Sequence, residues 1–249
     1  MKTLIRQMMM ENRFFIRRKD VLFWTLAFPI LFVLLFGAIY GNTKWEGPGL
    51  NIRAIDYLLP GILVMGVMVT GIMHTANGFV ADREKGIFRR LALTPLKRQT
   101  LIGGQMLHNF CVIIIQTLLL LNIGTLFFKT QLTGNLWLFW LVLSSGALCF
   151  MSIGFALTGL VKSVRSSTPV TQITLNTMMF LGGIFFPNSM MPNWLGNIAK
   201  VLPSTQMSDA LRAVIYNNAG IGDIWLKLLV MGAWVVVCLV ISIKFFRWE

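Results

Sequence analysis

The side chains that could carry out chemistry are few in this chain and lie far apart. Its 249 residues include three cysteines, two histidines and nine Asp and Glu residues. Cys111, Cys149 and Cys238 show neither the spacing of a metal site nor that of a redox pair, so we expect them to behave as small apolar side chains. We therefore expect no metal site.

The two histidines are more informative, because an ionisable side chain inside an apolar stretch is costly and often functional. His108 lies near one end of such a stretch and is expected to remain in contact with water. His74 lies deeper, where we expect a neutral ring that hydrogen-bonds between helices. A catalytic site made of His74, Asn77, Gln116 and Asn122 stays open as an alternative.

No motif of a soluble-type enzyme is present. The sequence has no GxxxxGK[ST] phosphate loop, no GxSxG elbow, no HExxH and no GxGxxG after a strand. We expect no catalytic residues and no ATP hydrolysis by this chain alone. All nine acidic residues lie in connections, at the ends of apolar stretches or in the tail. A secondary transporter more often places a carboxylate near the middle of the membrane, so this class is disfavoured.

The composition identifies the elements that must position these residues. Apolar residues make up 56% of the chain and charged residues 12%, which is too little polar surface for a water-soluble protein of this size. A membrane-spanning helix needs about 20 mostly apolar residues. We predict an all-α membrane protein, a single domain over residues 1–249, with six spans. The expected spans are 21–41, 57–79, 106–128, 136–161, 168–187 and 224–246.

The basic residues predict the orientation. Sixteen of the 22 Lys and Arg residues fall on one side of the predicted membrane, a side that includes both termini and the segment 82–98. Basic residues are retained on the cytoplasmic side, so we expect both termini to be cytoplasmic. The net charge of +13 is explained by this asymmetry and by anionic lipid, and nucleic acid is not expected as a partner.

The first 20 residues predict a helix that lies along the membrane surface and is retained rather than cleaved. Apolar residues recur there at helical spacing, and basic residues fall on the other side. The apolar set is Leu4, Ile5, Met8, Met9, Phe15 and Ile16, and the basic set is Lys2, Arg6, Arg13 and Arg17. The alternative is a basic stop before the first span.

The densest charge lies in DREKGIFRRLALTPLKRQTL, residues 82–101, between two apolar stretches. We predict a helix over residues 83–91 that ends before Thr94 and Pro95. Its apolar face, made of Ile87, Phe88 and Leu91, needs a covering surface. A partner protein, the membrane surface and the rest of the same bundle are the three candidates.

A second interrupted region follows the fifth predicted span. Residues 188–203 are too short to cross a membrane yet remain apolar. We predict a re-entrant or interfacial segment, because irregular backbone is tolerated at membrane depth only inside protein or beside water. It is either a lid over an exit path or an anchor that uses Trp194.

Two groups of residues carry a resemblance to a known family. One is Arg83-Glu84-Lys85-Gly86 followed by Leu91, Thr94-Pro95 and Arg98, and the other is GGIFFP at 182–187 followed by Leu202-Pro203-Ser204 and Ala210-Leu211-Arg212. In order and spacing they resemble the permease subunits of ABC-2 exporters, along nearly the whole chain. Ile87 stands where many relatives have threonine, and Gly103-Gly104-Gln105 replaces a common Gly-Lys ending.

The resemblance implies partners and a division of labour. A second permease copy or paralogue and two ABC ATPase subunits are expected, with ATP and Mg on the ATPase and no cofactor on this chain. The helix over residues 83–91 is expected to dock on the ATPase, and we name it the docking helix. The interfacial helix, with Arg6, Arg13 and Arg17, is expected to lie beside it. The docking residues implied are Glu84, Gly86, Ile87, Phe88, Arg89, Leu91 and Pro95.

The expected function is export of an amphipathic drug, antibiotic, peptide or lipid across the cytoplasmic membrane of a prokaryote. Its 15 methionines and 19 phenylalanines suit adaptable apolar surfaces. Alternatives are a polysaccharide or lipid-linked glycan exporter, an ATP-independent secondary transporter or channel, and a membrane-embedded enzyme. The candidate substrate path is His74, Asn77, Phe185, Phe186 and Met190.

Overall fold

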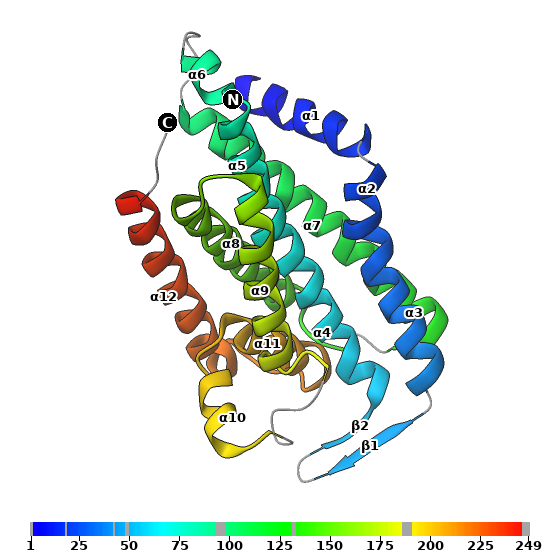
Figure 1. Cartoon of the computed structure of the whole chain (residues 1–249). Helices are drawn as coiled ribbons and strands as arrows, with labels where there is room; N and C mark the ends of the chain where they lie inside the picture. The colour runs from blue at the N-terminus through cyan, green and yellow to red at the C-terminus, as the bar shows by residue number, and fades with distance from the viewer. Residues whose placement is uncertain are drawn as a thin grey trace.

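Long helices run side by side in the computed structural model, with one helix lying across one end of the bundle and a hairpin at the other (Figure 1). The structure describes residues 2–17, 19–41, 43–47, 50–92, 98–130, 133–185 and 191–245. Its first half contains α1 (Lys2–Arg17), α2 (Lys19–Leu22), η1 (Phe23–Ala27), α3 (Phe28–Tyr40), β1 (Lys44–Gly47), β2 (Leu50–Arg53), α4 (Ala54–Met68), η2 (Val69–His74), α5 (Thr75–Glu84) and α6 (Ile87–Ala92). Its second half contains α7 (Arg98–Phe128), α8 (Leu136–Leu160), α9 (Val164–Leu181), α10 (Asn193–Ala199), α11 (Pro203–Tyr216) and α12 (Ile221–Phe245).

Five helical segments within the described residues are long and apolar enough to cross a membrane. They are Phe23–Tyr40, Ala54–Glu84, Ile102–Phe128, Leu136–Leu160 and Ile221–Lys244. The predicted helical membrane class is therefore confirmed. The prediction of six spans is not, because the helix at the fifth position, α9, is less apolar than the others. It contains Arg165, Gln172 and Asn176 among its 18 residues.

The segment Ala54–Glu84 is the central helix of the bundle. It combines α4, η2 and α5 without a break, and 89% of its most apolar window is buried. Its neighbours include α3, α7, α8, α9 and α11. Burial on all sides explains why this stretch has no polar face, because a helix surrounded by protein is apolar all round.

Close approach of the central helix to α8 depends on two glycines. A Cβ atom on Gly154 of α8 would lie 2.5 Å from the carbonyl oxygen of Gly71 and 2.8 Å from that of Ile72. A Cβ atom on Gly71 would lie 2.7 Å from Cβ of Phe150. Small residues let helix backbones touch where apolar surface alone cannot drive association, as in a membrane.

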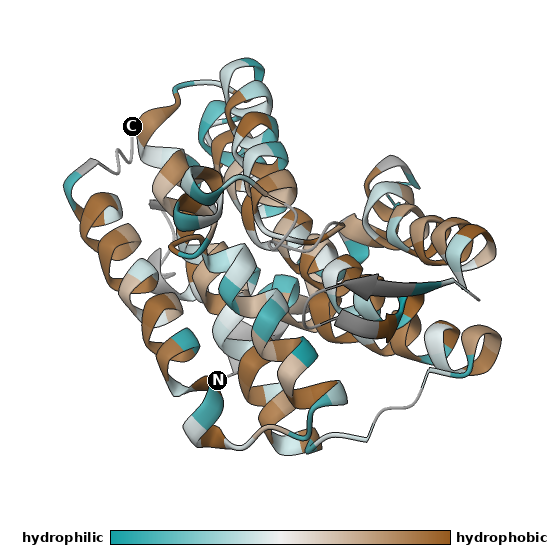
Figure 2. Cartoon of the chain, turned by 90° about the horizontal axis from the view of Figure 1, so that it is seen from below, coloured by the Kyte–Doolittle hydropathy of each residue, from teal (hydrophilic) through white to brown (hydrophobic). Residues whose placement is uncertain are grey.

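The outward surface of the bundle is apolar. α12 is the clearest case, because only 17% of its most apolar window is buried and Ile243 is 85% exposed. Seen from the hairpin end, apolar residues extend to the outer sides of the helices as well as the inner sides (Figure 2). This distribution is that of helices immersed in lipid.

A two-stranded antiparallel hairpin joins the first two membrane helices, which the all-α prediction missed. β1 pairs with β2 with Lys44 opposite Arg53 and Gly47 opposite Leu50. The Ala54 N–H donates to the Thr43 carbonyl at 2.9 Å, so the hairpin closes directly onto α4. The connection was too short and too irregular in its alternation to be recognised as two strands.

The chain after α9 is interrupted, as predicted, but part of the predicted segment lies outside the described residues. Within residues 191–202 the structure has the short helix α10, in which Trp194 is 67% exposed. Trp234 Nε1 of α12 donates to the Val201 carbonyl at 2.9 Å, which holds the end of this segment against the bundle. Whether the segment acts as a lid or as an anchor stays a prediction.

The contact at Gly154 can be tested by adding one methyl group. We expect Gly154→Ala to lower the free energy of unfolding by about 1–3 kcal/mol, because the new Cβ atom meets backbone that cannot move aside. Gly232→Ala in α12 is the matched control, since a Cβ atom there meets nothing within 4 Å. Thermal unfolding of the detergent-solubilised variants, followed by size-exclusion chromatography, measures the difference. Equal melting temperatures for the two variants would contradict this packing.

Candidate coupling surface and the contacts behind it

The predicted docking helix is separated from the central helix by a sharp turn. The central helix ends at Glu84, and Gly86 adopts a left-handed conformation with φ of 67° before α6 begins. The N–H groups of Lys85 and Gly86 donate to the carbonyls of Ala81 and Arg83, each at 3.0 Å, which is the usual way a glycine ends a helix. The prediction of one helix over residues 83–91 is therefore wrong. Gly86 could have indicated the break.

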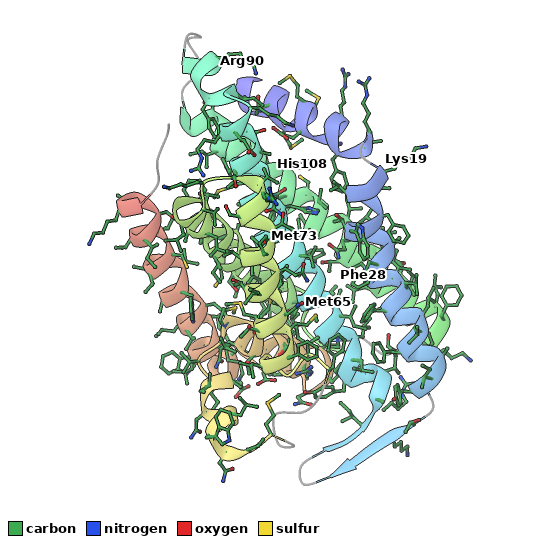
Figure 3. All side chains as sticks on the ribbon, in the orientation of Figure 1. Lys19, Phe28, Met65, Met73, Arg90 and His108 are labelled. Carbon is green, nitrogen blue, oxygen red and sulfur yellow. The ribbon has the colours of Figure 1, made fainter. Side chains whose placement is uncertain are left out.

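This turn changes the role of the acidic residues before it. Asp82 and Glu84 belong to the last turn of α5 and not to the start of the docking helix. They therefore do not lie at the N-terminus of α6 and cannot stabilise it. α6 lies at the same end of the bundle as α1, where Arg90 and Lys19 are labelled (Figure 3).

The apolar face of α6 lies partly against its own bundle. The Phe88 ring stacks on Phe79 of α5, with 6.3 Å between ring centroids, and Phe79 also meets Phe155 of α8 at 5.2 Å. Ile87 and Phe88 keep part of their surface exposed. The side chains of Arg89 and Leu91, and all of Pro95, lie outside the described residues. The docking role of all these residues stays a prediction.

Two neighbouring residues connect the end of α5 to the turn between α8 and α9. The Arg83 guanidinium donates to the Thr158 carbonyl at 3.2 Å and also to the Val161 carbonyl. The Glu84 carboxylate accepts from the Val164 N–H, the first residue of α9, at 3.2 Å. We name these contacts the Arg83–Glu84 clamp. Cations at the C-terminal end of a helix and anions at an N-terminal end are both electrostatically favourable, so the clamp holds α5, α8 and α9 together.

The helix α1 lies across the bundle and contacts α7, which confirms that the first residues form a separate helix. A Cβ atom on Gly104 of α7 would lie 2.6 Å from Cγ of Gln7, so α1 rests directly on α7. Arg13 and Arg17 are exposed. The side chain of Arg6 lies outside the described residues, and the role of these three arginines stays a prediction.

Phe15 of α1 fits between the two histidines. Its ring lies 5.4 Å from that of His108 and 6.3 Å from that of His74, both edge-on. His108 is only 6% exposed, so the expectation that it remains in contact with water is wrong; Figure 3 shows it inside the bundle, below α1. The sequence could not show that α1 covers this end of α7.

His74 bridges the first two membrane helices, as expected. Its Nε2 atom lies 3.1 Å from Oγ1 of Thr25 in η1. The Thr25 hydroxyl donates to the Val21 carbonyl at 2.6 Å, so the histidine nitrogen is the donor in this pair. The contact joins the two π-helical segments, η1 and η2, at the same depth in the bundle.

A carboxyl group of α1 is held in unfavourable surroundings at this end. Burial raises the pKa of Glu11 above its ordinary value, and the negative charge of Asp82 raises it further, while a hydrogen bond from Gln7 acts in the opposite direction. The position of α1 therefore places a weakly acidic group beside the last turn of the central helix.

The candidate path residues do not lie together. The Asn77 side-chain carbonyl accepts from Ser167 near the start of α9 at 2.7 Å. Phe185 follows the other end of α9 and lies 6.0 Å from Phe32 and 5.6 Å from Phe36 between ring centroids. The part of α9 from Ser167 to its last residue, Leu181, separates these levels by about 21 Å, at about 1.5 Å per residue. Phe186 and Met190 lie outside the described residues.

The alternative catalytic group is also dispersed. Gln116 lies beside Thr70, at 3.4 Å between side-chain oxygens, and Asn122 donates to the Leu118 carbonyl of its own helix at 2.7 Å. His74 and Asn77 contact other helices, as described above. These four side chains therefore serve four separate contacts in this conformation.

A buried arginine organises the opposite end of the bundle. Arg212 of α11 lies over the Tyr57 ring, with 3.6 Å from the guanidinium carbon to the ring centroid, and its side chain is 11% exposed. It donates to the Gly183 carbonyl at 2.7 Å and to the Tyr57 carbonyl at 3.2 Å. The Tyr57 hydroxyl donates to the same Gly183 carbonyl at 2.9 Å. Arg212 thus donates hydrogen bonds to backbone carbonyls that follow the end of α9 and have left its helical hydrogen-bond pattern.

The two regions that carried the resemblance lie at opposite ends of the bundle. One contains the Arg83–Glu84 clamp, and the other contains Arg212 with Tyr57 and Gly183, which we name the Arg212 cluster. The family model described as ABC-2 type transporter matches residues 2–216 of the chain. This chain belongs to the ABC-2 type transporter family. With its membrane helices, it is a multi-pass membrane protein.

The ABC-2 chain is also similar to individual transport proteins from several organisms. It is 23% identical over 250 residues to the putative transport permease YvfS of Bacillus subtilis, covering 99% of this chain and 98% of that protein. It is 25% identical over 244 residues to the daunorubicin resistance ABC transporter permease protein DrrB1 of Streptomyces coeruleorubidus, covering 97% and 83%. It is 25% identical over 210 residues to ABC transporter G family member 20 of Dictyostelium discoideum, covering 82% of this chain but only 27% of that protein.

Neither Arg83 nor Arg212 was predicted to be a site residue. Both belong to the motifs that carry the resemblance, but their hydrogen-bond acceptors are backbone carbonyls far along the chain. The acceptors of Arg83 lie 75 and 78 residues away, and the Gly183 acceptor of Arg212 lies 29 residues away. A carbonyl group carries no signal in the sequence. The only available indication was the cost of a guanidinium beside an apolar stretch, which requires a partner.

The Arg212 cluster predicts a loss of stability on substitution. We expect Arg212→Gln to lower the free energy of unfolding on the order of 3 kcal/mol, because two buried carbonyls lose charged donors. Arg165→Gln is the control, since Arg165 is exposed at the start of α9. Melting temperatures in the same detergent measure both. If Arg212→Gln melts with the wild type, the cluster does not hold the chain after α9.

Proposed function

We propose that this chain is the permease subunit of an ATP-driven exporter in the cytoplasmic membrane of a prokaryote. The observation that carries the proposal is α6, a short helix with apolar residues still partly exposed, set at the end of the central helix beside α1. Family membership supports this reading. So does the near-complete match to bacterial permeases of similar length.

The partner at α6 is an ABC ATPase, in two copies for two permeases. The sequence itself contains no phosphate-binding loop, so hydrolysis requires a separate subunit that binds ATP and Mg²⁺. Ile87 and Phe88 supply the apolar contact. The three arginines of α1 and the positive charge around α6 face the cytoplasm in this arrangement, as do both termini.

Movement of α6 reaches the membrane through short connections. Lys85 and Gly86 alone separate it from the central helix, and the Arg83–Glu84 clamp ties the same point to α8 and α9. Closure of the ATPase pair would therefore displace three helices as one body. The change needs an ATPase that binds the two permease conformations with different free energy.

A second copy of the permease covers the polar face of α9. Thr168, Gln172 and Asn176 recur every four residues on this helix and are exposed, and the Gln172 side chain donates to Asn176 at 3.1 Å. Exposed amides at membrane depth are costly in lipid and face protein or water instead. Two such faces, opposed across a two-fold axis, would line a path of mixed polarity.

The substrate class that suits this path is an amphipathic drug, antibiotic, peptide or lipid, moved outward. Ile173 and Phe180 are exposed on α9 beside the amides, at 67% and 61%, so one surface offers apolar and polar contacts. The names of two relatives support the same substrate class. One is the daunorubicin resistance permease DrrB1, and the other is the probable multidrug ABC transporter permease YbhR of Escherichia coli. YbhR is 22% identical over 184 residues, which cover 73% of this chain and 49% of that protein.

A glycan exporter and an ATP-independent transporter are the competing functions. Reconstitution distinguishes them. Vesicles with the permease and its ATPase should export amphipathic compounds only with ATP, whereas an ion gradient alone would drive a secondary transporter. Transport of a lipid-linked glycan without any effect of amphipathic compounds on ATP hydrolysis would favour the glycan exporter.

The docking surface predicts that acidic side chains on α6 detach the ATPase. We expect Ile87→Asp with Phe88→Asp to abolish co-purification of the ATPase and ATP-driven transport, because two charges would be buried in an apolar contact. Val201→Asp is the matched control, an exposed apolar residue at the opposite end of the bundle. A monodisperse double variant that still bound a fully active ATPase would disprove the docking assignment.

The Arg83–Glu84 clamp predicts a different defect, in transmission. We expect Arg83→Gln to keep the ATPase bound but to reduce transport per ATP hydrolysed at least about tenfold, since charged hydrogen bonds of about 1.5–3 kcal/mol are lost. Lys162→Gln, an exposed residue of the same turn, should leave the ratio unchanged. Parallel loss of ATPase binding in Arg83→Gln would show that the clamp is only part of the docking surface.

A further inference from the structure

A pocket of about 490 Å³ lies at the hairpin end of the bundle, away from the docking helix. Its walls are the end of α3, the end of α7 and the hairpin formed by β1 and β2, which lie at the same end of the bundle (Figure 1). Its volume falls within the range of about 300–1,000 Å³ typical of small-molecule sites. The proposed transport path along α9 does not include it.

The pocket exists because two helices end beside one another. The Phe128 ring lies against Gly37, where an added Cβ atom would come within 2.1 Å of it, and this contact brings the end of α7 onto α3. The chain then turns at Lys129, which has a left-handed φ of 50°. The backbone therefore leaves α7 sideways, and Lys129 lies on the rim.

Three cations gather around this pocket. Arg53 lines it and is held by Asp56, with hydrogen bonds of 2.7 and 3.0 Å, and by the carbonyls of Phe128 and Lys129, each at 3.3 Å. Lys44 stands directly opposite Arg53 in the hairpin, and opposite residues of a pair share one face. Lys44 and Lys129 are both exposed.

The balance of charge here is positive. Arg53 is neutralised by Asp56, whereas no carboxylate whose side chain the structure describes forms an ion pair with Lys44 or Lys129. The side chain of Glu46 lies outside the described part. Outside the more basic end, the sequence has only six Lys and Arg residues. Arg53 and Lys129 line this pocket, and Lys44 stands opposite Arg53. Cations gathered at a rim of backbone polar groups attract an anion.

The side of the pocket that faces the membrane is apolar. Ile39 of α3 and Phe127 of α7 both contribute to its lining and are 59% and 69% exposed. They belong to segments that are long and apolar enough to cross the bilayer. A ligand in this pocket would therefore meet cations at one side and hydrocarbon at the other.

We propose that this pocket binds the head group of an anionic phospholipid. Lys129 and Lys44 contact the phosphate, Arg53 fixes the shape of the site through its carbonyl contacts, and the acyl chains lie along Ile39 and Phe127. The exposed apolar wall favours a lipid over a soluble anion, because a free phosphate would leave that wall unused. The proposal does not depend on the export function.

The test uses the full chain in nanodiscs of phosphatidylcholine with or without phosphatidylglycerol. We expect phosphatidylglycerol to raise the melting temperature of the wild type and to be retained in native mass spectra after detergent extraction. Lys44→Gln with Lys129→Gln should weaken retention roughly tenfold. The matched control is Lys200→Gln with Lys227→Gln, two other lysines outside the more basic end, which should retain the lipid as the wild type does.

Two further arms decide the source and the chemistry. Lys44→Arg with Lys129→Arg should keep retention, because the positive charge remains. Inorganic phosphate added to pure phosphatidylcholine discs should give little protection. Equal retention by the Gln variant and the wild type would overturn the proposal, as would protection by inorganic phosphate equal to that by phosphatidylglycerol, which would assign the pocket to a soluble anion.

Discussion

Contact between the central helix and α8, backbone against backbone, is the constraint on which the rest of the bundle depends. In a membrane, apolar surface does not drive helices together, because lipid is as apolar as leucine. Association depends on close packing and on hydrogen bonds between helices, and Gly71 with Gly154 lets the backbone of the central helix approach the backbone of α8. Around this contact the other helices pack on the remaining sides of the segment Ala54–Glu84.

Within the described residues, the charged contacts of the central helix lie near the two ends of the bundle. The Arg83–Glu84 clamp satisfies the end of α8 and the start of α9, and the Arg212 cluster satisfies the interrupted chain after α9. In both places an arginine donates to a backbone carbonyl just beyond the end of a helix, Val161 after α8 and Gly183 after α9. Since Glu84 holds the start of α9 and Arg212 holds the chain after it, the position of α9 is defined even though it is less apolar than the membrane-spanning helices.

The sequence was sufficient for the features that depend on composition and on period. The membrane class and the family were predicted and are confirmed. The first residues form the helix α1, and its predicted place along the membrane surface stays a prediction. The break at Gly86 and the burial of His108 were missed, and both depend on what another segment covers or on the conformation of one residue. The hairpin was missed because four-residue strands carry too little alternation to be read. The docking residues remain predictions, since their covering surface would be another protein.

The π-helical segment η2 changes the orientation of side chains along the central helix. A π turn holds one residue more than an α turn, and one residue corresponds to about 100° of rotation about the axis. The positions before and after η2 are therefore out of phase. α4 packs chiefly against α3, α7 and α11, whereas α5 packs chiefly against α8 and α9, although α4 also contacts α8 and α5 also contacts α7. One uninterrupted rod thus presents differently oriented sides to its upper and lower neighbours, and a single periodic template cannot describe both halves.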